Sequence, residues 1–157
     1  VLNLTSNDPS LSVAEAFSQY TINLIQFCPI NAAFLGDYTL STVATGIYDS
    51  VVFVNGTVTI SQGTEPTDRV MSVSPYPEFG AFPAIDFNFS LICDKIIVAP
   101  SQPTGVGCGS STTIGPAETT GSYDTDDDTT FNIVITDDEG GASCGLAYTS
   151  EFVLTKI

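Results

Sequence analysis

The chain of 157 residues contains no histidine and no tryptophan, and its only basic side chains are Arg69, Lys95 and Lys156. The lack of histidine excludes a Ser-His-Asp or Cys-His relay and any metal site that depends on imidazole. Eighteen acidic residues against three basic ones give a formal charge of −15. This balance excludes the positive surface with which proteins bind nucleic acids or anionic lipids. These absences favour structural, adhesive and binding functions.

Long apolar runs are also missing from the chain. The apolar runs at residues 51–54 and 96–99 are far shorter than the roughly 20 residues of a membrane-spanning helix, so we expect no membrane insertion. No charged segment followed by an apolar core occurs at Val1, and we expect a secreted protein whose signal peptide has been removed.

Four cysteines occur, and they form neither a C-x-x-C pair nor a set with histidine, which argues against structural zinc. Two disulfides are the favoured interpretation, although the sequence alone permits other pairings. We predict Cys28–Cys93 and Cys108–Cys144, because each bond would join segments that resemble neighbouring strands or their ends. Disulfides predict an extracellular location, whereas four buried free thiols would indicate a cytosolic protein.

Strict alternation of apolar and polar residues is the recurring pattern. It is clearest in residues 85–91, where phenylalanine, isoleucine and leucine alternate with aspartate, asparagine and serine, and it recurs in residues 20–24 and 131–136. Such a pattern predicts strands with one buried and one wet face. About seven to nine short strands separated by turns predict an all-β protein. We expect a single antiparallel β-sandwich, jelly-roll or immunoglobulin-like, with two disulfides.

Three segments carry more specific local signals. Asn55-Gly56 lies between residues 51–54 and 57–60, and this dipeptide favours a two-residue hairpin turn. A capping-box pattern predicts one or two helical turns in residues 13–19. The proline-rich segment 61–83 is typical of a long connection or an edge strand.

Three sequons, at Asn3, Asn55 and Asn88, predict N-linked glycans. Asn55 is expected at a hairpin tip and Asn88 on the polar face of a strand, where a glycan would project into solvent. The other interpretation is that these are three ordinary surface asparagines.

Alternating carboxylates at Asp124, Asp126 and Asp128 have a spacing that calcium uses in loops. They do not form an EF-hand, since Thr129 stands where that loop needs glycine and Ile135 where it needs glutamate. We predict calcium as the candidate metal at this cluster and no required cofactor.

A second acidic segment, residues 137–139, follows the predicted strand 131–136, so the two acidic groups should lie at its opposite ends. The alternative to a calcium site is a pair of solvated, mutually repelling turns, which we favour. Paired carboxylates also serve glycoside hydrolysis, but no catalytic motif surrounds any acid here. We therefore predict no enzymatic activity and no catalytic residues.

The N-terminus begins with an alternating segment, Val1–Thr5, in which Leu2 and Leu4 face one way. Asn7-Asp8-Pro9 then separates it from the rest, so we predict an N-terminal arm at residues 1–8 and one domain at residues 9–157. A short apolar strand on a flexible break suits donation to a neighbour's sheet. It would otherwise be the first strand of the chain's own sandwich.

In this respect the chain resembles subunits of extracellular pili and filaments, which are secreted, all-β and disulfide-stapled, with a strand-like N-terminal arm. The resemblance implies a homopolymer assembled through strand exchange, with Leu2 and Leu4 as assembly residues. A carbohydrate- or protein-binding module, assisted by calcium, is the second interpretation. An acidic enzyme that acts on glycosides is the third.

Overall fold

The computed structural model describes residues 2–3, 19–20 and 28–157, and almost all of its regular structure is β. The strands and short 3-10 helices are β1 (Leu2–Asn3), β2 (Gln19–Tyr20), β3 (Gly36–Ala44), η2 (Ile47–Asp49), β4 (Gly56–Gln62), β5 (Asp68–Val73), β6 (Ile85–Ile92), β7 (Lys95–Val98), β8 (Gln102–Pro103), β9 (Thr113–Pro116), β10 (Gly121–Asp124), β11 (Asp127–Asp137), η3 (Glu139–Gly141) and β12 (Tyr148–Lys156). No helix in the described residues is long and apolar enough to cross a membrane.

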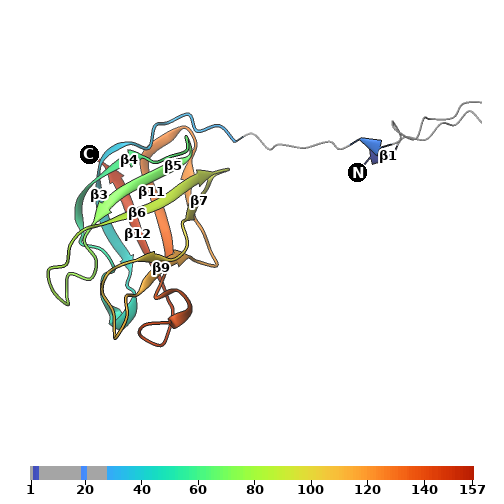
Figure 1. Ribbon diagram of the computed structural model, residues 1–157. Helices are drawn as coiled ribbons and strands as arrows, with labels where there is room; N and C mark the ends of the chain where they lie inside the picture. The colour runs from blue at the N-terminus through green and yellow to red at the C-terminus, as the bar shows by residue number, and fades with distance from the viewer. Residues whose placement is uncertain (1, 4–18, 21–27) are drawn as a thin grey trace, which may run out of the picture.

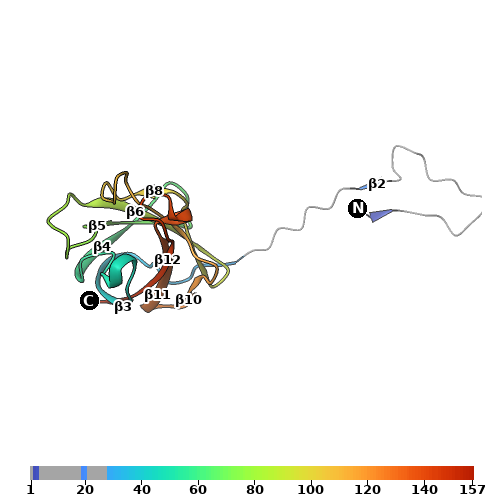
Figure 2. The same ribbon diagram turned by 90° about the horizontal axis from the view of Figure 1, so that it is seen from below.

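The main sheet closes on itself as an eight-stranded antiparallel barrel, so the predicted sandwich is wrong although the all-β class is confirmed. The order β10-β7-β6-β5-β4-β3-β12-β11 becomes a ring because β10 also pairs with β11. Figure 2 shows this ring from below. Strand β11 shares one edge between two partners, β10 near its start and β9 at its end, and β8 adds to β9.

Local irregularities help the sheet to curve. The register shifts between Glu151 and Phe152 in the pairing of β12 with β3, and again between Ser122 and Asp124 in the pairing of β10 with β11. Such irregularities bend a strand and increase its twist, which a sheet needs to close. A sandwich and a barrel both bury alternate residues, so the closing pair, and not the alternation, distinguishes them.

The barrel interior is filled by the alternating residues that the sequence indicated. In β6, Phe87, Phe89 and Leu91 are all buried, while Asp86 and Asn88 face solvent. Aromatic rings meet edge to face across the interior, and these contacts add to the burial of apolar area. The pairs with ring centroids within 5.6 Å are Phe34–Tyr123, Phe34–Phe131, Tyr38–Phe131, Phe53–Phe87 and Phe53–Phe152.

The predicted hairpin at Asn55-Gly56 is absent, and residues 51–54 form no strand beyond one bridge at Phe53. Strand β4 pairs with β3 and β5 instead, and the 45–55 loop connects β3 to β4. A two-residue turn of this kind needs positive φ at both positions, but only Gly56 has it. The side-chain oxygen of Asn55 instead accepts hydrogen bonds from the backbone N–H and hydroxyl of Thr42, at 2.8 and 2.9 Å.

Segment 61–83 is also different from the prediction, because it contains β5, an interior strand between β4 and β6. Its prolines lie outside the strand and therefore remove no ladder hydrogen bond. The predicted helix at 13–19 and strand at 20–24 lie outside the described residues, apart from Gln19 and Tyr20. These two form β2, which pairs with β1 in a separate two-stranded sheet.

Both predicted disulfides are present. Cys28–Cys93 joins the segment before β3 to the turn between β6 and β7, and Cys108–Cys144 joins the β8–β9 loop to the segment before β12. Two disulfides indicate an oxidising environment such as the cell exterior.

The barrel has two distinct ends in Figure 1. The upper end carries the C-terminus and the point where the chain enters the barrel near residue 28. The lower end carries the loops that contain η2 and η3. Two candidate functional features lie at these opposite ends: the segment that enters the barrel at the upper end and a pocket beside η2 at the lower end.

Candidate functional site

At the upper end, residues 28–34, the anchor segment, hold the chain entering the barrel. The Cys28–Cys93 disulfide fixes the start of this segment. The backbone N–H groups of Asn31 and Ala32 both donate to the carbonyl of Thr125, at 2.9 and 3.0 Å. The Asn31 amide also donates to Asp126 at 2.6 Å. One covalent bond and several hydrogen bonds thus hold a segment that has no regular structure of its own.

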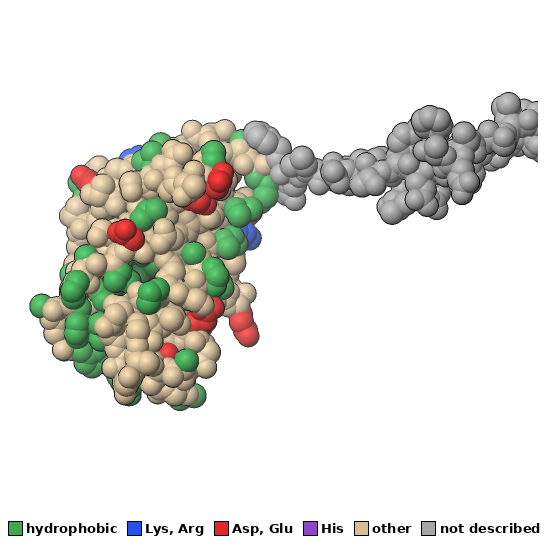
Figure 3. All heavy atoms as spheres, in the orientation of Figure 1, with side chains coloured by type: hydrophobic (Ala, Val, Ile, Leu, Met, Phe, Trp, Pro, Cys, Tyr) green, Lys and Arg blue, Asp and Glu red, His purple; other side chains and the backbone are tan. Residues whose placement is uncertain are grey.

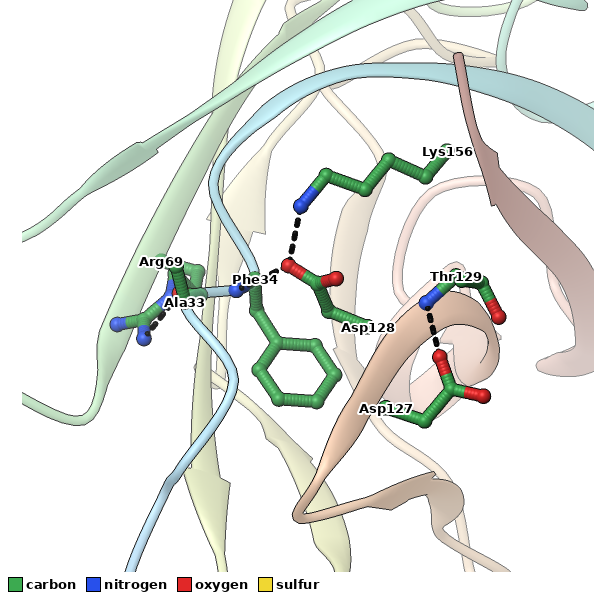
Figure 4. Close-up of polar contacts among 7 residues, drawn as sticks. All are labelled: Ala33, Phe34, Arg69, Asp127, Asp128, Thr129 and Lys156. Carbon is green, nitrogen blue, oxygen red and sulfur yellow. Dashed lines mark hydrogen bonds and ion pairs between the residues drawn. The ribbon is translucent and has the colours of Figure 1, made fainter.

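The end of the anchor segment is held by the side chains drawn in Figure 4. Asp128 accepts hydrogen bonds from the backbone N–H of Phe34, at 3.0 Å, and from Lys156. Arg69 donates to the carbonyl of Ala33 at 2.9 Å. The Phe34 side chain is fully buried among core aromatics. Burial opposes ionisation of Asp128, but its bonds with Lys156 and Phe34 outweigh this effect and lower the pKa of that carboxyl.

The three carboxylates predicted to hold calcium have separate partners. Asp128 faces Lys156, Asp126 binds the Asn31 amide, and Asp124 accepts the backbone N–H of Asp126 at 3.0 Å. Within residues 28–157 and the two short strands, no three His, Cys, Asp or Glu side chains form a group that would hold a metal ion. Calcium binding here stays a prediction, and the structure associates two of these residues with the anchor segment.

The sequon asparagines have different surroundings. Asn55 is exposed, and Asn88 is exposed on β6, where its amide donates to Gln102 at 3.3 Å and to the carbonyl of Asp86 at 3.1 Å. For Asn3 the structure describes only the backbone, in β1, and Leu4 lies outside the described residues. Glycosylation therefore stays a prediction at all three sequons.

At the lower end, two aspartates expected in a solvated turn are fully buried, and that expectation is wrong. Asp137 accepts hydrogen bonds from the backbone N–H of Ile47, at 2.9 Å, and from the Tyr76 hydroxyl. Asp138 accepts the backbone N–H groups of Ser143 and Cys144, at 3.0 and 2.6 Å. Each carboxylate therefore organises a loop, since buried charges are stable only when they are bonded.

Next to these aspartates lies an open pocket of about 450 Å³, lined in part by Tyr76 and Cys144, which bond to them. Four aromatic side chains line it, together with the Cys108–Cys144 disulfide and Thr112; the aromatic residues are Tyr48, Tyr76, Phe79 and Phe82. The Tyr48 ring lies at 85° to the Phe79 ring, with centroids 6.2 Å apart, and the Tyr76 ring lies at 51° to it, at 6.3 Å. The rings therefore present faces at different angles instead of a flat stack.

Both tyrosines of the pocket have unusual backbone conformations. Tyr48 and Tyr76 have φ values of 56° and 48°, in the left-handed region that bulky residues rarely adopt. Such conformations concentrate at functional sites because the surrounding structure must hold them in place. The Tyr76 hydroxyl is held by Asp137 and Thr112, and burial, followed by the Asp137 charge, raises the pKa of that phenol well above its usual value.

Sequence reasoning missed this pocket because its residues come from distant, irregular segments. Tyr76 was visible only as an aromatic residue among prolines, and Tyr48 follows a strand end with no motif around it. The acidic run at 137–139 was noticed but assigned to solvent, since sequence does not show that Ile47 and Tyr76 supply donors to it.

Two carboxylates with opposite pKa shifts, the buried Asp137 and the partly exposed Asp128, predict a specific pH dependence. Burial raises the pKa of Asp137, so its proton uptake favours the folded state as pH falls. The lowered pKa of Asp128 means that its contribution is present above the usual carboxyl pKa and is lost as pH falls below it. We expect the free energy of unfolding to hold or rise between about pH 7 and 5, aided by weaker self-repulsion, and to fall below about pH 4.

Urea unfolding at closely spaced pH values measures this profile. Asp128→Asn should flatten the fall below pH 4, whereas the exposed-site control Asp86→Asn should leave the profile unchanged. A steady loss of stability from pH 7 to 5 would contradict the assignment.

No family model matches the chain, and no curated protein or solved structure is significantly similar to it. The geometry of the barrel is what bears on function, and two of its features stand out: the anchor segment at the upper end and the aromatic pocket at the lower end.

Proposed function

We propose that the protein is a secreted structural or adhesive surface protein, a subunit of an extracellular filament to which the N-terminal arm contributes a donated strand. The observation that carries this proposal is that the barrel is complete without the arm. Among the residues that the structure describes, β1 pairs with β2 in a separate two-stranded sheet, and the barrel begins at β3. This arrangement supports the arm as an assembly element over the arm as the barrel's own first strand.

The anchor segment supports the same proposal on mechanical grounds. A strand donated to a neighbour transmits any pull on the filament to the residues where the arm meets its own barrel. Here that point is Cys28, which is covalently joined to the β6–β7 turn. The bonds of Asn31, Ala33 and Phe34 to three other parts of the upper end distribute the pull further. A first segment held to the barrel by hydrogen bonds alone would detach under a smaller force than one held by a disulfide.

A donated strand also needs an exposed edge, and the barrel is most weakly closed at β10. Only Gly121 and Ser122 pair with β7, and only Ser122 and Asp124 pair with β11, with an irregular register between them. Short, interrupted pairing leaves backbone groups available for β-augmentation. We assign the acceptor edge to this region of the neighbouring subunit.

Removing residues 1–8 tests the proposal. The truncated protein should keep the barrel and both disulfides but lose polymers in negative-stain images and in size-exclusion chromatography. Placing aspartate at both Leu2 and Leu4 should act in the same way, because it would bury unpaired charge at the junction, at a cost of several kcal/mol. Asn3→Asp is the matched control, since it adds charge on the opposite face and should leave the polymers intact.

Adding back a peptide of residues 1–8 should raise the melting temperature of the truncated barrel. If the truncated protein forms the same polymers as the full chain, the arm has no role in assembly. If it unfolds and does not respond to the peptide, the arm is part of its own domain.

A second candidate function is an extracellular binding module, and the aromatic pocket favours it. This function does not require the arm, so ligand binding that persists after removal of residues 1–8 would separate it from filament assembly. The two functions are compatible, because the pocket is lined by residues of η2 and of the loop that follows η3, at the end of the barrel opposite to the anchor segment. Figure 1 shows these loops at the lower end and the entry of the chain at the upper end.

A further inference from the structure

The pocket at the lower end is built from aromatic faces and has no charged side chain in its lining. Tyr48 and Phe79 are 66% and 53% exposed, so their faces are open to a ligand, while Tyr76 forms the buried wall. Aromatic faces carry negative electrostatic potential and attract cations that lie over them. Several rings set at different angles around one space can enclose a compact cation, whereas a flat ligand would contact fewer of them.

The charges around the pocket favour the same kind of ligand. The chain has three basic side chains, and all three lie at the upper end, in β5, at the start of β7 and at the end of β12. On the face shown in Figure 3, the blue side chains are confined to the upper half of the body. The lower end carries the acids Asp49, Asp137, Asp138 and Glu139, and the ion pairs seen within the described part of the chain instead involve Asp94 and Asp128.

Tyr76 connects the buried charge to the pocket wall. Its hydroxyl donates to Asp137, which increases the electron density of the ring that faces the pocket. The Asp137 oxygens are occupied by Tyr76 and Ile47, so the carboxylate contributes its field and forms no direct contact with the ligand. A ligand that needs a strong hydrogen-bond donor, such as a carboxylate or phosphate, would find no cation here and would be repelled by these acids.

We propose that this pocket binds a quaternary ammonium group, as found in choline head groups and in trimethylated lysine. Such a cation gives up little hydration and fills an aromatic site without hydrogen bonds, which suits a lining of rings and a disulfide. The site is independent of filament assembly, because it lies at the end of the barrel opposite to the anchor segment.

The sharpest test compares two ligands of nearly equal shape. Choline and its neutral carbon analogue 3,3-dimethylbutan-1-ol differ in the charged nitrogen, so isothermal titration of the full chain with each isolates the contribution of charge. We expect choline to bind about tenfold more tightly than the neutral analogue, because the charged nitrogen makes cation–π contacts with more than one ring. A trimethyl-lysine peptide against its unmodified form then distinguishes a protein source of the cation from a small-molecule or lipid source.

Variants test whether the rings are responsible. Phe79→Leu keeps an apolar side chain but removes the aromatic face, and it should weaken choline binding about fivefold or more while leaving binding of the neutral analogue nearly unchanged. Tyr148→Leu is the matched control, since Tyr148 is an exposed aromatic residue outside the pocket lining, and binding should be unaffected. Equal affinities for choline and its analogue, or no binding of choline, would overturn the proposal.

Discussion

Replacing Asp137 with alanine is expected to lower the free energy of unfolding by about 3–5 kcal/mol, among the largest effects of any single substitution in this chain. The substitution would leave the backbone N–H of Ile47 and the hydroxyl of Tyr76 buried without an acceptor. It would also leave a cavity beside Gly46, which packs against the carboxylate so closely that an added Cβ would lie 2.3 Å from its oxygen. We expect the loop around η2 and the pocket wall to lose order together.

Chemical unfolding of Asp137→Ala against Asp86→Ala measures this effect. Asp86 is an exposed acid on β6, so its removal should change stability by less than about 0.5 kcal/mol. Asp137→Asn should be intermediate, because the amide retains one acceptor oxygen for the two donors. A loss below about 1 kcal/mol for Asp137→Ala would show that solvent reaches the two donors and that the carboxylate does not organise the lower end.

Removing either disulfide should cost about 4 kcal/mol, because the bonds close chain separations of 65 and 36 residues. The functional consequences should differ between them. Replacing both Cys108 and Cys144 with alanine removes part of the pocket lining, so binding of choline should fall together with stability. Replacing both Cys28 and Cys93 releases the anchor segment, so polymers should break more readily while the pocket is retained.

Thermal unfolding, thiol titration and the titration with choline distinguish these outcomes on the same proteins. The untreated native protein should contain no titratable thiol, since all four cysteines are paired. If the polymers of a Cys28/Cys93 variant resist shear as well as those of the unchanged protein, the anchor segment does not contribute to the strength of the filament. A Cys108/Cys144 variant that binds choline normally would place the site elsewhere.

The sequence determined the strand content and much of what lies inside the barrel. Apolar and polar side chains that alternate residue by residue lie on opposite faces of a strand, whereas a helix would mix them on each face. This alternation therefore located β6 and most of β11, with Phe87 and Phe131 among the buried residues. The favoured disulfide pairing is confirmed, although the sequence alone also permitted other pairings.

Local signals failed where a partner distant in the chain decided the conformation. Asn55-Gly56 favours a turn in isolation, but Thr42 supplies two donors to Asn55 and β4 pairs with β3. Distant partners also bind two of the alternating carboxylates, since Asp126 and Asp128 accept hydrogen bonds from the anchor segment, which no local pattern indicated; calcium binding there stays a prediction.

Composition and alternation by themselves determined an acidic, all-β chain without imidazole chemistry, since these properties depend only on which residues are present and how they alternate. The four cysteines favoured two disulfides, which the structure contains. Only the tertiary structure decided that the sheet closes as a barrel, because closure depends on the pairing of β10 with β11. The burial of Asp137 and the pocket beside it depend on donors and rings contributed by segments far apart in sequence, at Ile47 and Tyr76. Burial and ring orientation are properties of assembled segments, and no local pattern encodes them.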